Sequence, residues 1–224
     1  MADKIENQTL AASLNEKLEK SKGIVFAAGG IVVVLIVALA VIASVRAKEI
    51  SKGIERVDSI SYSLLSESAE ISDSDIAARQ NKALEELAPL SGKSGVVGLR
   101  SNMLVAEIKF AQKNYDEARS AWLKAADVNK KAYTAPLCYY NAAVCCENLN
   151  DIDGAVSYYK VASEYEDFVL IDHALFSLGR VNEAAQKYDE AKAAYEKLNE
   201  IRPSSNWGKL AKSRIIFLKS AGNI

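Results

Sequence analysis

A pattern that recurs every 36 or 37 residues constrains the fold of this chain more than any other feature. Its most regular position is an alanine, found at Ala118, Ala155 and Ala191. A second small residue stands twelve positions before each alanine, at Ala106, Ala143 and Gly179. An aromatic residue stands four positions after each alanine, at Trp122, Tyr159 and Tyr195. Periods of this length are typical of repeat proteins built from stacked helix pairs.

The residue types explain how such a pair packs. A small residue on the first helix lets the second helix approach closely, at the point where its own alanine lies. A large residue opens each second helix, at Tyr115, Ile152 and Tyr188. The aromatic residue that follows lies on the same face and packs against the next pair. We therefore predict an all-α helical-hairpin solenoid whose core is formed by stacking.

On these residues the chain resembles the tetratricopeptide repeat family. The third copy is the best match, with Leu178-Gly179, Tyr188-Asp189-Glu190-Ala191, Tyr195 and Pro203. The first copy has Lys130 where the family has its closing proline. The resemblance covers roughly residues 97–204, and the periods exceed the usual 34 residues, which implies longer turns. A last amphipathic helix, about Ser205–Ser220, is expected to cap the array.

An uncharged apolar segment from Gly23 to Val45 precedes the repeats. As a helix it would measure roughly 35 Å, enough to cross a hydrocarbon layer of ~30 Å. The competing interpretation is a cleaved signal peptide with Ala38-Leu39-Ala40 as its cleavage site. Lysine and arginine are equally frequent on the two sides of the segment, so charge does not fix its orientation.

The expected organisation has four parts. Residues 1–22 form a short tail, 23–45 a transmembrane helix, 46–94 linking helices, and 95–224 the repeat domain with its capping helix. A helix is expected to continue beyond the membrane to about residue 67. A turn then follows at Ser66–Asp75, with Ser72 or Asp73 as the N-cap of the next helix.

This layout resembles the ancillary SecYEG translocon subunit (YfgM-like) family. The resemblance implies an inner-membrane protein with its repeats outside the cytoplasm. It also implies partners among the SecYEG translocon, periplasmic chaperones and secreted clients. Three unpaired cysteines would point away from an oxidising compartment, so the two indications conflict.

In such arrays the first helix of each pair lines a concave groove that binds proteins or extended peptides. Helical spacing from the small residues gives four groove candidates in each pair. They are Arg100, Met103, Glu107 and Phe110, then Leu137, Tyr140, Val144 and Glu147, then His173, Phe176, Arg180 and Glu183. Such a mixture of aromatic, methionine and opposed charged residues suits an adaptable peptide site, although burial between helices would explain the same pattern.

Little else in the sequence indicates chemistry. His173 is the single histidine, no nucleophile accompanies it, and we predict neither a catalytic nor a metal site. Cys138, Cys145 and Cys146 share one predicted helix and are expected to be buried thiols. Gly92-Lys93-Ser94 resembles the end of a phosphate-binding loop, but Leu87 stands where its first glycine belongs. A net charge of −1 gives no indication of nucleic-acid binding.

The sequence therefore predicts a membrane-anchored repeat protein that binds client or partner proteins, with no enzymatic activity and no cofactor. The alternative is a structural scaffold that tethers a cell-envelope or division complex without binding clients.

Overall fold

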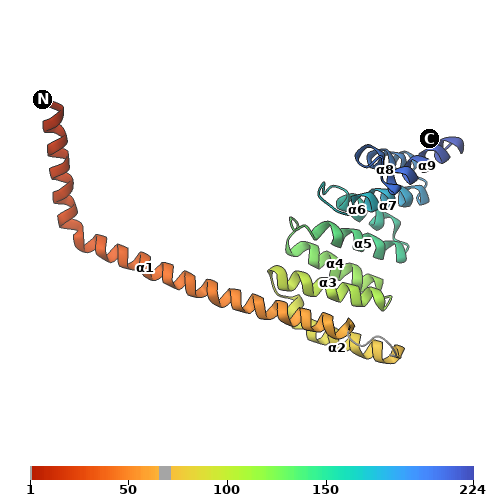
Figure 1. Cartoon of the computed structure of the whole chain (residues 1–224), viewed down its shortest axis with the longest axis horizontal. Helices are drawn as coiled ribbons and strands as arrows, with labels where there is room; N and C mark the ends of the chain where they lie inside the picture. Colours follow the sequence, from red (N-terminus) through yellow and green to blue (C-terminus); the bar gives the residue numbers. More distant parts are fainter. Residues whose placement is uncertain (1, 66–71) are drawn as a thin grey trace. The chain divides into compact units, whose positions relative to one another are not determined.

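The computed structural model describes residues 2–65 and 72–224 of the chain. It divides into two units, Met1–Lys52 and Gly53–Ile224. In the described residues every regular element is a helix, and none is a strand. Helix α1 (Ala2–Leu65) begins in the first unit and ends in the second (Figure 1).

The first unit consists of helix α1 alone and contains the apolar segment. The large apolar side chains described between Ile24 and Val45 are 48% to 78% exposed. In the described part of the chain, one helix is long and apolar enough to cross a membrane, and it runs over this segment. Within the first unit, no described residue covers these side chains.

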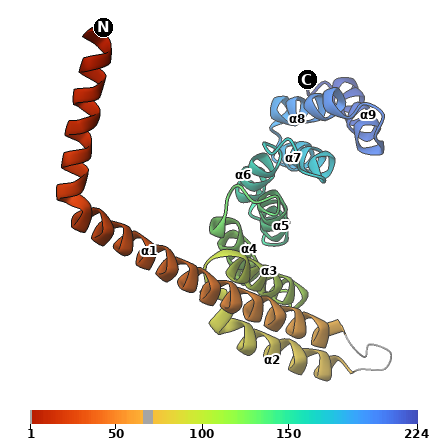
Figure 2. The ribbon, with the colours of Figure 1, turned by 60° about the vertical axis from the view of Figure 1, so that its left-hand side comes forward.

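The second unit is a stack of antiparallel helix pairs that follow one another in chain order (Figure 2). Its helices after α1 are α2 (Asp73–Ser91), α3 (Gly95–Ala111), α4 (Tyr115–Val128), α5 (Ala135–Asn148), α6 (Ile152–Ala162), α7 (Ile171–Ala184), α8 (Tyr188–Ile201) and α9 (Asn206–Ser220). The predicted repeat pairs are α3/α4, α5/α6 and α7/α8, and the prediction of stacked helical hairpins is confirmed.

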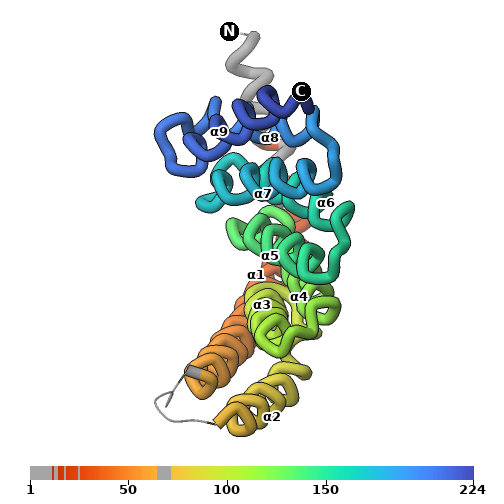
Figure 3. Tube along the Cα trace, turned by 90° about the vertical axis from the view of Figure 1, so that its right-hand side faces the viewer, coloured from red at the N-terminus to blue at the C-terminus, as the bar shows by residue number. Residues whose placement is uncertain are grey.

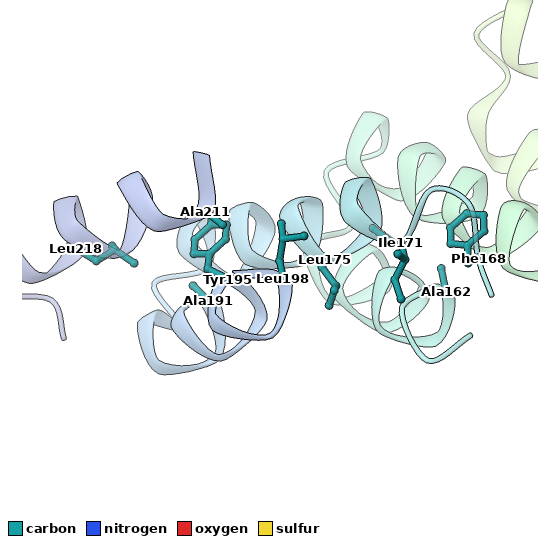
Figure 4. Close-up of a cluster of buried hydrophobic side chains, with 10 residues drawn as sticks. Ala162, Phe168, Ile171, Leu175, Ala191, Tyr195, Leu198, Ala211 and Leu218 are labelled. Atoms are coloured by element: carbon teal, nitrogen blue, oxygen red, sulfur yellow. The ribbon is translucent and has the colours of Figure 1, made fainter. Parts of the chain in front are cut away.

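The residues of the repeat pattern form the core between these helices. The three alanines that define the period are fully buried, at 0% exposure. The aromatic residues that follow them are 4%, 1% and 0% exposed, in the order Trp122, Tyr159 and Tyr195. Figure 4 shows one such cluster, in which Tyr195, Leu198 and Ala191 of α8 lie with Leu175 of α7 and Ala211 of α9. The prediction that stacking provides the core is thus confirmed by burial.

Each pair also makes the same turn between its two helices. Lys113, Asn150 and Gln186 have positive φ values of 63°, 57° and 59°. The next residue donates its backbone N–H to a carbonyl five positions back, as in Asn114 N to Lys109 O at 2.9 Å. This is the Schellman arrangement, which satisfies carbonyls left free at a helix end. The repeat therefore extends to backbone conformation, with the same 37- and 36-residue spacing.

The end of α1 and helix α2 form the first layer of the second unit (Figure 3). Val57 and Ile60 of α1 share a buried cluster with Leu87 of α2 and with Leu104 of α3. Gly53 is buried, and a Cβ at this position would lie 2.7 Å from a methyl carbon of Val97, so α1 and α3 approach closely. Ser72 caps α2 by accepting a hydrogen bond from the backbone N–H of Asp75. The part of the predicted turn at 66–71 lies outside the described residues.

Helix α9 covers the last pair, as expected for a cap. Its inner face contains Ala211 and Leu218, which are 0% and 1% exposed, and Ser205 is its N-cap. Leu210 and Ile216 are instead 49% and 60% exposed. Only part of the apolar surface of α9 therefore packs on the array.

Candidate protein-binding surface

Three of the four candidate residues of the first pair lie at one pocket. Arg100, Met103 and Glu107 of α3 line a cavity of about 470 Å³, together with residues of α1 and of the connection between α4 and α5. Arg100 forms an ion pair with Asp58 of α1. Phe110 is not among the lining residues and packs edge-on against Tyr115, with ring centroids 5.2 Å apart.

The candidate residues of the second pair are all half-buried on α5. Tyr140 packs against Tyr159 of α6 and Phe168, with ring centroids 5.3 and 6.4 Å away. Leu137 and Val144 pack at the edges of two neighbouring apolar clusters. These side chains contribute to the core while keeping part of their surface in solvent.

The candidate residues of the third pair are largely engaged by helix α9. His173 and Phe176 both pack on the Trp207 ring, with centroid distances of 4.6 and 4.9 Å. Glu183 accepts hydrogen bonds from Arg214. The prediction placed these side chains in a ligand groove, and the structure shows that the capping helix already occupies part of their surface.

Two carboxylates on this surface hold neighbouring helices together. Glu147 accepts hydrogen bonds from Tyr159 Oη at 2.5 Å and from Arg180 Nη2 at 2.7 Å, and so joins α5, α6 and α7. Burial and then the Glu147 carboxylate raise the pKa of Tyr159. Burial acts to raise the pKa of Glu183, but the hydrogen bonds and charge of Arg214 together with the Tyr195 hydroxyl outweigh it, and the pKa is lowered.

The three cysteines lie inside the array on α5. Cys138, Cys145 and Cys146 are all 0% exposed, as expected from the sequence. Burial raises the pKa of the Cys138 and Cys145 thiols from 9.0 to about 12. A thiol held in its protonated form is a poor nucleophile, so these side chains act as small apolar core residues.

Several residues at the pocket were not predicted from the sequence. Tyr133 and Thr134 come from the connection between α4 and α5, and Val57 and Ser61 come from the end of α1. The 37-residue period partly indicated this contribution. The residues beyond the usual 34 lengthen the connection between α4 and α5, and that connection contains Tyr133. The helical spacing of Val57, Ile60 and Leu64 indicated an apolar face on α1, but not that this face would pack beside α3.

Comparison with known proteins agrees with this geometry. The family described as "Tetratricopeptide repeat" matches residues 137–166 and 172–205, which are the second and third pairs. The chain carries tetratricopeptide repeats. The α3/α4 pair lies outside the match although it forms the same hairpin. This repeat fold is typically a non-catalytic scaffold for protein–protein interaction.

A curated relative and two solved structures are also similar to the chain. A "TPR repeat-containing protein" of Treponema pallidum (strain Nichols) is 34% identical over 139 residues, which are 62% of this chain and 58% of the relative. The chain thus spans somewhat more than half of that relative's length.

Among solved structures, the apo form of RapI superimposes with a TM-score of 0.52 at 19% identity, covering 74% of this chain and 47% of that chain. A crystal structure of MamA has a TM-score of 0.47 at 15% identity, covering 70% of this chain and 88% of that one. The likeness to RapI shows the fold alone.

Proposed function

We propose that the protein is a membrane-anchored accessory subunit whose repeats bind client or partner proteins beside the Sec translocon. The observation that carries the proposal is the partly exposed row of side chains along the first helices α3, α5 and α7. It contains Met103, Tyr140 and Phe176, which are half-buried and apolar. Adaptable apolar side chains among charged ones are suited to binding extended polypeptides.

Membrane anchoring is supported by the exposed apolar segment of α1. Isolated surface leucines are ordinary, but the described side chains between Ile24 and Val45 form a large exposed apolar surface. A lipid hydrocarbon layer is the environment that would cover such a helix while its backbone hydrogen bonds stay internal. Association with the translocon, and a position of the repeats outside the cytoplasm, are supported by resemblance of layout alone.

Mild crosslinking in intact cells followed by co-purification tests the function. We expect translocon subunits and a varied set of unfolded secreted proteins to accompany the full-length chain. Recovery of one fixed set of envelope proteins without clients would instead support a structural scaffold and contradict the proposal.

A charge-introducing variant ties recovery to the proposed surface. Met103→Glu should reduce client recovery, whereas Ser157→Glu on the exposed surface of α6 should not. Tyr140 and Phe176 are less suitable positions, because their rings also pack on Tyr159 and Trp207. If both variants recover clients as the wild type does, the binding surface lies elsewhere.

Protease protection in sealed vesicles tests the orientation. The proposal expects the repeats of inside-out inner-membrane vesicles to be protected, and those of spheroplasts to be digested. The reverse pattern would place the repeats in the cytoplasm.

A further inference from the structure

The pocket at the first repeat pair differs in character from the rest of the candidate surface. Its volume of about 470 Å³ lies within the usual range of ~300–1,000 Å³ for ligand pockets. Leu99, Met103 and Leu104 of α3 provide an apolar wall, and Val128 adds to it from the end of α4. Tyr133 stands at this pocket with 92% of its surface exposed, so an aromatic ring is available to an incoming group.

Two polar groups in this pocket lack an internal partner. In the described part of the chain, no cationic group lies within ion-pair distance of the Glu107 carboxylate. Glu147 of α5 and Glu183 of α7 lie one helical turn beyond the positions that correspond to Glu107 in their repeats. These two carboxylates are bound by Arg180 and Arg214. The hydroxyl of Thr134, Oγ1, is buried and makes no hydrogen bond.

The surroundings of Glu107 favour a cation as its partner. The residue remains accessible to solvent, yet partial burial desolvates its carboxylate and raises its pKa. Arg100, the basic residue among those lining the pocket, is already paired with Asp58. A negatively charged ligand would therefore meet an unpaired carboxylate, whereas a positively charged one would neutralise it.

We propose that this pocket receives a lysine or arginine side chain of a bound polypeptide, with the charged end at Glu107 and the aliphatic stem against Leu99, Met103 and Tyr133. Long basic side chains bury their methylene groups on apolar surfaces while the charged end stays polar. Apolar side chains next to the basic residue of the bound polypeptide would contact the rest of the apolar wall of the pocket. This inference rests on the proposed protein-binding function and specifies the sequence that the repeats select.

A positional-scanning library of acetylated hexapeptides, applied to the full-length protein in detergent micelles, tests the inference. The wild type should enrich lysine or arginine next to leucine, isoleucine, methionine or phenylalanine. Glu107→Gln should lower the preference for a basic residue by about 2–5-fold, in line with the loss of a solvent-exposed ion pair. Glu107→Asp should keep the preference, and Glu107→Lys should shift it towards aspartate and glutamate.

Two controls separate recognition from folding. Glu200→Gln makes the same charge change at an exposed position of α8 and should leave the library profile unchanged. Tryptophan fluorescence from Trp122 and Trp207 should be the same in every variant, because Glu107 is exposed and outside the core. Loss of the folded signal in Glu107→Gln would contradict the assignment of Glu107 to ligand recognition alone.

The outcomes distinguish this inference from the function on which it rests. Retention of peptides without a basic preference, or with a preference that Glu107→Gln leaves intact, overturns the inference and leaves protein binding in place. Failure of the wild type to retain any peptide overturns both.

Discussion

Replacing Gly179 with alanine tests the close helix crossing that the repeat pattern implies. Gly179 of α7 faces the ring of Tyr195 on α8, and a Cβ at position 179 would lie 2.4 Å from Tyr195 Cε1 and 2.6 Å from Cζ. An ordinary contact is 3.4–4 Å, so the ring would have to move by about 1 Å. Tyr195 is 0% exposed and its ring centroid is 5.5 Å from that of Phe176, which leaves little room for the movement.

The expected change in stability is the balance of two opposing terms. Alanine is favoured over glycine inside a helix by ~0.8–1 kcal/mol. Forcing an additional carbon into a well-packed core costs ~1–3 kcal/mol. We therefore expect Gly179→Ala to lower the free energy of unfolding by about 1 kcal/mol. Gly92→Ala is the matched control, because no atom lies within 4 Å of its Cβ position and its φ is −83°. It should be neutral or slightly stabilising.

Urea denaturation followed by tryptophan fluorescence measures both variants. The chain contains two tryptophans, Trp122 in α4 and Trp207 in α9, so the signal reports the repeat array and not α1. In a Tyr195→Leu background the penalty of Gly179→Ala should shrink or reverse, because the outer ring atoms are gone. If Gly179→Ala stabilises the otherwise unaltered protein as much as Gly92→Ala does, the close crossing of α7 and α8 is not as described.

Three further predictions concern the buried thiols, one helix cap and one turn. Because burial raises the pKa of Cys138 and Cys145 from 9.0 to about 12, stability that is present below pH 9 should be lost as the pH rises towards 12. The loss is at most about 1.4 kcal/mol per pH unit for each thiol, and the double variant Cys138→Ala/Cys145→Ala should show a shallower slope of unfolding free energy against pH. An unchanged slope would contradict burial of these thiols. Asp151 caps α6 through Gly154 N at 2.9 Å and pairs with Arg119 at 3.1 Å. Asp151→Ala should therefore cost about 1 kcal/mol in urea denaturation, and Asp151→Asn, which keeps a capping oxygen, should cost less. Equal losses of unfolding free energy in Asp151→Ala and Asp151→Asn would show that the capping hydrogen bond does not stabilise α6. Lys113 has a φ of 63°, a conformation that glycine adopts more readily than lysine. Lys113→Gly should therefore raise the free energy of unfolding by ~0.5–1 kcal/mol. A decrease in the urea midpoint would contradict the left-handed conformation of the α3/α4 turn.

The helix pairs could be predicted from the sequence because their core residues recur at fixed spacing. Tyr115, Ile152 and Tyr188 were expected to open the second helices, and they are the first residues of α4, α6 and α8. These positions depend on local periodicity, which one sequence displays directly. The α3/α4 pair followed from the same spacing even though Lys130 replaces the closing proline.

The pairing of the candidate surface residues could not be predicted in the same way. Helical spacing assigned Glu147 and Glu183 to groove positions open to a ligand. In the structure they are bound by Arg180 and Arg214, which stand 33 and 31 residues later in the chain. Contacts of that range depend on how successive pairs rotate against each other, which helical spacing does not specify. For the same reason, spacing placed His173 and Phe176 in an open groove without showing that Trp207 packs on them.

Site-specific photo-crosslinking tests the central claim, that the first helices of the repeats form the protein-binding surface. A photoreactive residue would replace Val144 of α5 in one version of the full-length chain and Ser157 of α6 in another. The account predicts crosslinks to other proteins from position 144 and few or none from position 157. Equal crosslinking at both positions, or crosslinking from position 157 alone, would contradict it.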